Sequence, residues 1–122
     1  MSRMDKVNEQ VKREISLIVQ QELGDPRMQF VTITKVEVSA DLRNARVFFS
    51  VMGTVPQTEA VGEALEKASG VIRRHLGQRI EMRYLPALNF IFDKSIAESI
   101  RLEKAMQEIQ DEREHEKNHS DS

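Results

Sequence analysis

Two groups of residues are of types that could do chemistry: a histidine pair near the C-terminus and a run of basic residues in the middle. His115 and His119, with Glu116 between them, match the H-E-x-x-H spacing of a zinc site on a helix, in which the glutamate acts as the base. A catalytic zinc also needs a third protein ligand and ordered surroundings. No apolar residue follows Gln110 to hold such a site, so we expect a solvated polar tail without a metal.

The basic residues gather between positions 67 and 83, where Glu81 is the single acid. They are Lys67, Arg73, Arg74, Arg79 and Arg83. Arginine binds phosphate through paired hydrogen bonds and stacks on unpaired bases, so this cluster is typical of an RNA-binding surface. The alternative is a polar helix face that only keeps the protein in solution, which is about as common for two or three arginines.

The composition offers no positive case for an enzyme. The 122 residues include no cysteine, no P-loop and no dinucleotide-binding fingerprint, so we expect neither catalysis nor a cofactor. No apolar run could cross a bilayer and the charged N-terminus does not resemble a signal peptide, which predicts a cytoplasmic protein away from membranes.

The net charge of −2 divides into +2 for residues 1–94 (14 Lys/Arg, 12 Asp/Glu) and −4 for residues 95–122 (4 Lys/Arg, 8 Asp/Glu). An acidic tail therefore follows a mildly basic body.

The first half of the chain predicts a helix and two strands. Apolar residues recur at three- and four-residue steps from Met4 to Ile18, which predicts an amphipathic helix that ends near Gly24. β-Branched residues dominate positions 31–38, and apolar residues alternate with polar ones through positions 45–51. These runs predict two antiparallel strands, because only a short polar loop joins them.

The second half predicts a helix, a strand and a last helix. Helical spacing at positions 61–76 is followed by Gly77, which resembles a helix terminator. Pro86 restricts the next strand, at 88–92, to a sheet edge or a late start. A Ser-x-x-Glu capping box at 95–98 predicts the last helix. This order predicts an α+β fold with helices on one face of a small sheet.

A Ser-Gly pair interrupts the middle helix directly before Arg73 and Arg74. Glycine inside a helix costs about 1 kcal/mol relative to alanine, so Gly70 calls for a reason. Either the helix bends or admits another backbone there, or the glycine packs tightly against the sheet, and the spacing favours neither. Arg73 and Arg74 lie about 100° and 200° around the helix from the apolar Ile72, so both are expected to point to solvent or to a partner.

Three segments, in unbroken order, resemble the bacterial ribosome-binding factor A family. They are DPR at 25–27, VTITKVEVSADLRNARVFFS at 31–50 and ASGVIRRHLGQRIEMRYLPALNFIFDKS at 68–95. The resemblance extends from about Met4 to Met106. It implies a single KH-like, rRNA-binding domain of type II topology, α-β-β-α-kink-α-β, in residues 1–94. A C-terminal helix that runs into an acidic, disordered tail is expected in residues 95–122.

In this family a kinked helix–helix junction of the Ala-x-Gly type replaces the GxxG loop of ordinary KH domains. The resemblance places that junction at residues 68–70 and implies that Gly70 bends the helix. The second half would then direct its N-terminus, Arg73 and Arg74 toward RNA phosphates, which helix N-termini attract. The full expected RNA-binding set is Lys67, Ala68, Ser69, Gly70, Arg73, Arg74, Arg79, Arg43 and Arg46.

The resemblance also implies a function and partners. Members of the family are assembly factors that bind 16S rRNA late in maturation of the small ribosomal subunit, particularly in the cold, and leave before translation. Maturation of the rRNA 5′ end depends on them, although they carry no nuclease site. We therefore expect a non-enzymatic monomer that binds 16S rRNA, free 30S subunits and small-subunit ribosomal proteins. One alternative is a protein-interaction module that uses the amphipathic terminal helices; another is a hydrolase built on His115 and His119.

Overall fold

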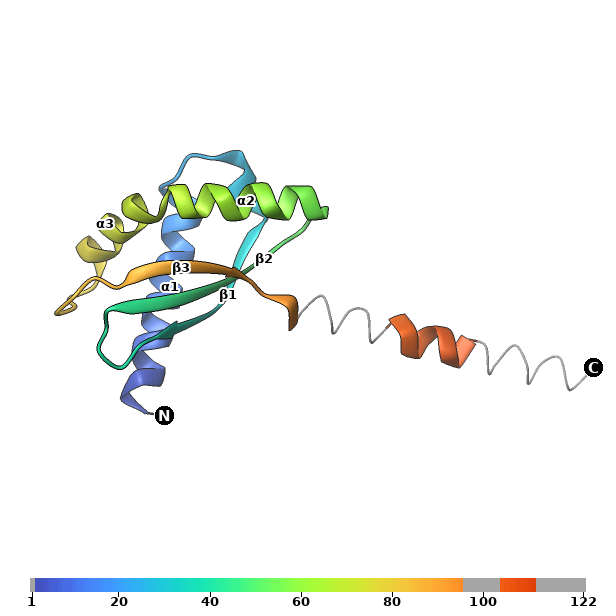
Figure 1. The fold of residues 1–122 in the computed structure, drawn as a ribbon, viewed down its shortest axis with the longest axis horizontal. Coiled ribbons are helices and arrows are strands. Elements are labelled where there is room, and N and C mark those ends of the chain that lie inside the picture. Colours follow the sequence, from blue (N-terminus) through green and yellow to red (C-terminus); the bar gives the residue numbers. More distant parts are fainter. Residues whose placement is uncertain (1, 96–103, 112–122) are drawn as a thin grey trace, which may run out of the picture.

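The computed structural model describes residues 2–95 and 104–111. In that part of the chain, three helices cover one face of a three-stranded sheet, and residues 104–111 form a further helical segment whose residues are all exposed (Figure 1). The predicted α+β class and the predicted order of elements are confirmed, and the order agrees with the KH-like topology that the resemblance implies. Within those residues no helix is both long and apolar enough to cross a membrane.

Helix α1 (Arg3–Gln21) forms where the apolar spacing predicted it. Ser2 and Asp5 start it with a capping box, because each side chain accepts a hydrogen bond from the backbone N–H of the other. Its buried face packs on the sheet and consists of Val11, Ile15, Ile18 and Val19. The helix ends before Gly24, whose positive φ of 64° suits glycine.

A short 3-10 helix, η1 (Pro26–Phe30), connects α1 to the sheet and was not predicted. Pro26 occupies its first turn, and Asp25 accepts a hydrogen bond from the Arg27 N–H at 3.0 Å. These residues match the DPR segment that contributed to the family resemblance.

The sheet has the strand order β1-β2-β3. Strand β1 (Val31–Val38) pairs with β2 (Asn44–Val51) in antiparallel fashion, and β3 (Ala87–Phe92) pairs with β2 in parallel. Strand β3 is thus an edge strand that starts directly after Pro86, as predicted. A register shift between Ile33 and Lys35 moves the buried positions of β1 by one residue.

The middle helix is divided into α2 (Val55–Lys67) and α3 (Ser69–Arg79), and Ala68 joins them (Figure 1). Ala68 ends α2 and precedes α3 with φ −85° and ψ −1°. The expected kink is present, but Gly70 lies inside α3 rather than at the break. Its φ is not positive, and a Cβ there would meet nothing within 4 Å. Tight packing, the other explanation considered for Gly70, is therefore wrong.

Gly77 does not terminate its helix, contrary to prediction, because α3 continues to Arg79. A Cβ at Gly77 would lie 2.9 Å from Cδ1 of Leu85. The glycine instead allows the loop at residues 81–86 to pack against α3.

The buried side chains form one core between the helices and the covered face of the sheet. Leu65 from α2 and Ile72 and Leu76 from α3 are fully buried, together with Ile15 from α1 and Val47 from β2. The junction therefore bends without breaking the apolar stripe, since residues on both sides of Ala68 reach the same core.

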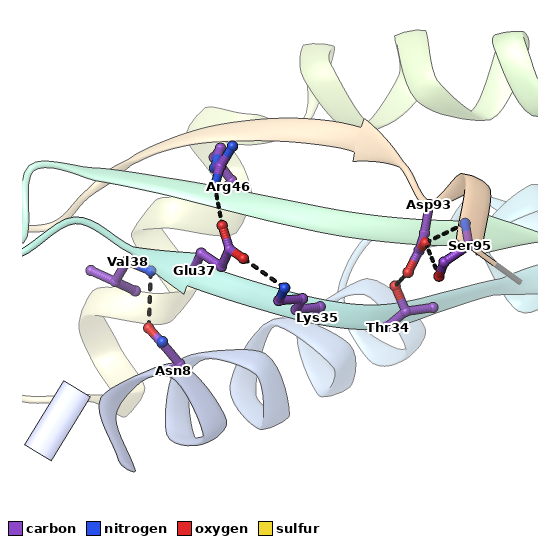
Figure 2. Close-up of polar contacts among 8 residues, drawn as sticks. All are labelled: Asn8, Thr34, Lys35, Glu37, Val38, Arg46, Asp93 and Ser95. Carbon is purple, nitrogen blue, oxygen red and sulfur yellow. Dashed lines mark hydrogen bonds and ion pairs between the residues drawn. The ribbon is translucent and has the colours of Figure 1, made fainter. Parts of the chain in front are cut away.

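The chain leaves β3 at Asp93, which precedes the helical residues Lys94 and Ser95. Asp93 accepts hydrogen bonds from the Ser95 N–H and hydroxyl and from the Thr34 hydroxyl on β1, the last at 2.6 Å (Figure 2). The helix thus begins one residue before Ser95, the predicted cap. Glu98, the other member of that box, lies outside the described residues, as does the histidine pair at 115 and 119. The boundary at 94/95 stays a prediction.

Candidate RNA interface

The expected RNA-binding residues fall into separate environments. The first is the helix junction, where Lys67, Gly70 and Arg74 are exposed and Ala68 and Ser69 are half-buried. No side chain caps the start of α3, so its first N–H groups carry the partial positive charge of a helix N-terminus. Neither Lys67 nor Arg74 has an ion pair among the described residues. The role of this junction in RNA binding stays a prediction.

Arg73 has a different environment from Arg74, and the expectation that it points to solvent or a partner is wrong. It is half-buried, and its guanidinium donates to two backbone carbonyls, of Leu85 and of Pro86, each at 3.0 Å. Arg73 therefore holds the loop at residues 81–86 against α3.

Arg79 joins α3 to α1 through two carboxylates. Its Nη1 lies 3.4 Å from Oε2 of Glu14 and its Nη2 lies 3.1 Å from Oε1 of Glu22. Only 27% of its side chain is exposed, so the charge is largely satisfied within the protein. Arg79 therefore links α3 to α1 and has a structural role. Its position in the basic cluster of the sequence did not indicate this role.

Arg46 lies on the sheet face opposite the helices, because it alternates along β2 with the buried Ala45 and Val47. It pairs with Glu37 on β1, and Lys35 contacts the same carboxylate at 2.7 Å (Figure 2). Lys35 first, and then Arg46, hold the pKa of Glu37 below its usual value. The structure therefore does not bring Arg46 together with the helix junction.

Arg43 lies in the β1–β2 loop and contacts residues that the predicted set omitted. Its Cζ lies 5.3 Å from the ring centroid of Tyr84, and the Cζ of Arg83 lies 5.6 Å from the same centroid. All three residues are exposed. The sequence placed Arg83 in the basic run but not in the predicted RNA-binding set. The signal that could have indicated this site is the adjacent Arg83–Tyr84 pair.

Negative charge lies on α2 beside the junction. A shallow groove between α2 and β3 is lined by three glutamates, Glu59, Glu63 and Glu66, and also by Lys67. Glu66 also accepts a hydrogen bond from the Phe90 N–H on the edge strand at 3.0 Å. Carboxylates repel phosphate, so this groove suits RNA less well than the outer side of α3 and the Arg43 end of the sheet do.

Comparison with known proteins shows which family this chain resembles. The family model described as Ribosome-binding factor A matches residues 3–106. Two relatives named Ribosome-binding factor A are 40% identical over 111 residues, in Brevibacillus brevis, and 42% identical over 109 residues, in Acetivibrio thermocellus. The alignments cover 91% of this chain and 92% of the first relative, and 88% of this chain and 89% of the second.

Solved structures agree in fold. The crystal structure of ribosome-binding factor A from Thermus thermophilus has a TM-score of 0.67 and 28% identity, and covers 74% of this chain and 96% of that one. A homology model of the Thermus thermophilus factor, fitted into the cryo-EM map of its complex with 30S, has a TM-score of 0.60 and 29% identity, and covers 71% and 91% of the two chains. Because the family model matches most of the chain and both relatives are at least 40% identical over most of its length, this chain belongs to the ribosome-binding factor A family.

Proposed function

We propose that this protein is a non-enzymatic assembly factor that binds 16S rRNA in the immature 30S subunit and promotes its late maturation, including processing of the rRNA 5′ end. It acts as a monomer in the cytoplasm and contacts small-subunit ribosomal proteins near its rRNA site. Family membership and the neighbour fitted to a 30S complex support ribosome binding. The surface chemistry supports rRNA as the direct contact.

The observation that carries the proposal is the exposed positive charge at the α2–α3 junction, which forms no ion pair among the described residues. Lys67 and Arg74 are exposed beside the start of α3, and neither contacts a carboxylate among the described residues. Side-chain cations and helix N–H groups both attract phosphate, so one segment supplies two kinds of anion-binding group.

Gly70 supports the same surface. Its φ is not positive and its missing Cβ leaves open space, so neither the backbone conformation nor internal packing requires a glycine. The remaining use of glycine is to let a partner backbone approach the helix closely. Gly70 would thus permit the sugar-phosphate chain to lie against the first turn of α3.

The test is co-sedimentation with immature 30S subunits through sucrose gradients. Arg74→Glu should reduce the bound fraction strongly, because it replaces an attraction to phosphate with a repulsion. Arg46→Glu makes the same charge change on the opposite sheet face and should bind nearly as wild type does; because Arg46 pairs with Glu37, the melting temperature of this control is measured alongside. Equal binding by both variants would count against the assigned surface. In cells, Arg74→Glu should also cause 16S rRNA with an unprocessed 5′ end to accumulate.

A protein-interaction module is the second candidate. The helical segment 104–111 exposes Met106 and Ile109, which are 56% and 50% accessible. The apolar face of α1 is instead buried in the core, so the predicted use of both terminal helices has support only at the C-terminal end. A pull-down in which this protein still captures a ribosomal protein after ribonuclease treatment and at high salt would favour this candidate.

A further inference from the structure

We propose that Tyr84, with Arg43 and Arg83, forms a stacking site for an unpaired base of the RNA, a second contact that rests on the proposed function. Tyr84 is 43% exposed, and the two guanidinium carbons lie 5.3 and 5.6 Å from its ring centroid. An aromatic ring stacks on a base of any sequence, and nearby arginines contact the flanking phosphates.

The two arginines keep their charge available. Neither Arg43 nor Arg83 has an ion pair in the described part of the chain. The nearby Asp41 forms no ion pair with Arg43; its carboxylate accepts hydrogen bonds from the Ser39 hydroxyl and from the backbone N–H of Arg43. The result is an exposed aromatic ring beside two cations that form no ion pair within residues 2–95 and 104–111, which suits a polyanion that presents bases.

Three contacts hold the loop that carries Tyr84 and Arg83, two with α3 and one with the β1–β2 loop. The guanidinium of Arg73 holds the carbonyls of Leu85 and Pro86, and the missing Cβ of Gly77 lets Leu85 pack against α3. The Ala87 N–H donates to the carbonyl of Arg43 at 2.8 Å, which ties this loop to the β1–β2 loop. The backbone that carries the ring and both cations is therefore held before any ligand arrives, which lowers the entropic cost of binding.

An unpaired base fits these observations better than a duplex does. Stacking needs an exposed base face, which a paired helix presents only at its ends. A lone tyrosine with adjacent arginines is also frequent at protein interfaces, so a ribosomal protein is the competing occupant. The experiment has to separate those two partners.

Two substitutions test the role of the ring on immature 30S subunits. Tyr84→Phe keeps the ring and should bind within about twofold of wild type. Tyr84→Leu keeps an apolar side chain but removes the ring, and should weaken binding about tenfold or more, as expected when one base loses its stacking partner. Its melting temperature should match wild type, because the side chain is exposed. Wild-type affinity for Tyr84→Leu would overturn the site and leave the Arg74 surface intact, whereas a wild-type chain that does not bind subunits would overturn the proposed function.

Photocrosslinking identifies the partner. A benzoylphenylalanine placed at position 84 of the full chain should crosslink to 16S rRNA, and a crosslink to a ribosomal protein alone would overturn the proposal.

Tyr84 is also the only tyrosine, and there is no tryptophan, so tyrosine labelled in the ring gives one set of NMR signals. Saturating single-stranded oligouridylate should shift those signals upfield. Signals that stay fixed at saturation contradict base stacking.

Discussion

Arg73 and Arg74 are neighbours in the sequence but differ in their surroundings. The turn of about 100° between them directs one guanidinium onto the carbonyls of the loop at 81–86 and leaves the other exposed. Helical geometry alone predicted that both point to solvent or to a partner, which is wrong for Arg73. It could not show that Arg73 would meet carbonyls 12 and 13 residues later, because the position of that loop depends on the tertiary fold.

The same pair allows stability and binding to be separated. Arg73→Gln should lower the free energy of unfolding by about 1–3 kcal/mol, because two partly buried carbonyl groups lose charged donors. Arg74→Gln, the matched control, should change it by less than about 0.5 kcal/mol, as is usual for exposed positions. Chemical denaturation of both variants measures these values. Equal losses would contradict the different roles assigned to the two arginines.

Asp93 predicts a pH dependence. The Ser95 hydroxyl first, and then the Thr34 hydroxyl, hold the pKa of this carboxyl below its usual 3.8. A carboxyl with a lowered folded-state pKa stabilises the fold above its unfolded pKa, and the contribution is lost as the pH falls through the folded value. Asp93→Asn should therefore destabilise the protein at about pH 7, and its difference from wild type should shrink below about pH 4.

Denaturant unfolding across this pH range measures the effect, and NMR titration of the Asp93 carboxyl provides a direct control. Thr34→Val removes one donor and should raise the pKa toward 3.8. A difference in stability between wild type and Asp93→Asn that persists unchanged at the lowest pH would show that the lost contacts, and not the charge, are responsible.

At the scale of elements, periodicity predicted most of the fold because one face of each element is buried in a single core. Alternation located β2, and Pro86 located the start of β3. The errors occur where a local signal had more than one use. Gly77 looked like a terminator but provides space for Leu85, and Gly70 looked like the bend but lies one residue inside α3.

These two glycines give a paired prediction for α3. Gly70→Ala should raise the free energy of unfolding by a few tenths to about 1 kcal/mol, because a helix gains from alanine and the new Cβ meets open space. Gly77→Ala should gain less or lose stability, since its Cβ would lie 2.9 Å from Leu85. Thermal unfolding of both variants provides the comparison.

Binding of Gly70→Ala to immature 30S subunits then separates stability from function. A more stable protein that binds less well supports close approach of the RNA backbone. A variant that binds as well as wild type would leave Gly70 without a functional explanation.

At the scale of the whole molecule, charge separates into regions that the sequence order did not disclose. Arg79 is 57 and 65 residues from its partners Glu22 and Glu14 and leaves the basic cluster when the chain folds. Arg43 and Tyr84 are also far apart in the sequence, yet their side chains meet. The sequence could therefore predict that a basic surface exists near α3 but not which arginines form it.

The tail gives a prediction for the whole protein. A chain truncated after Gln110 should retain most of its binding to immature 30S subunits, because the junction and the Arg43 end remain. Binding should weaken steeply with salt in both chains, and Arg74→Gln should reduce the slope of log K against log salt by about 0.7–0.9 if it removes one phosphate contact. Loss of function on truncation would instead favour a role for the histidine pair.

The direction of β3 has a consequence for the acidic segment that follows it. The strand begins beside the Arg43 end of the sheet and finishes at Phe92, and its six residues cover about 20 Å. This separation exceeds two Debye lengths at physiological ionic strength, where each is about 8 Å. Screening over this range predicts that affinities for RNA measured with and without residues 95–122 converge as counterions are added.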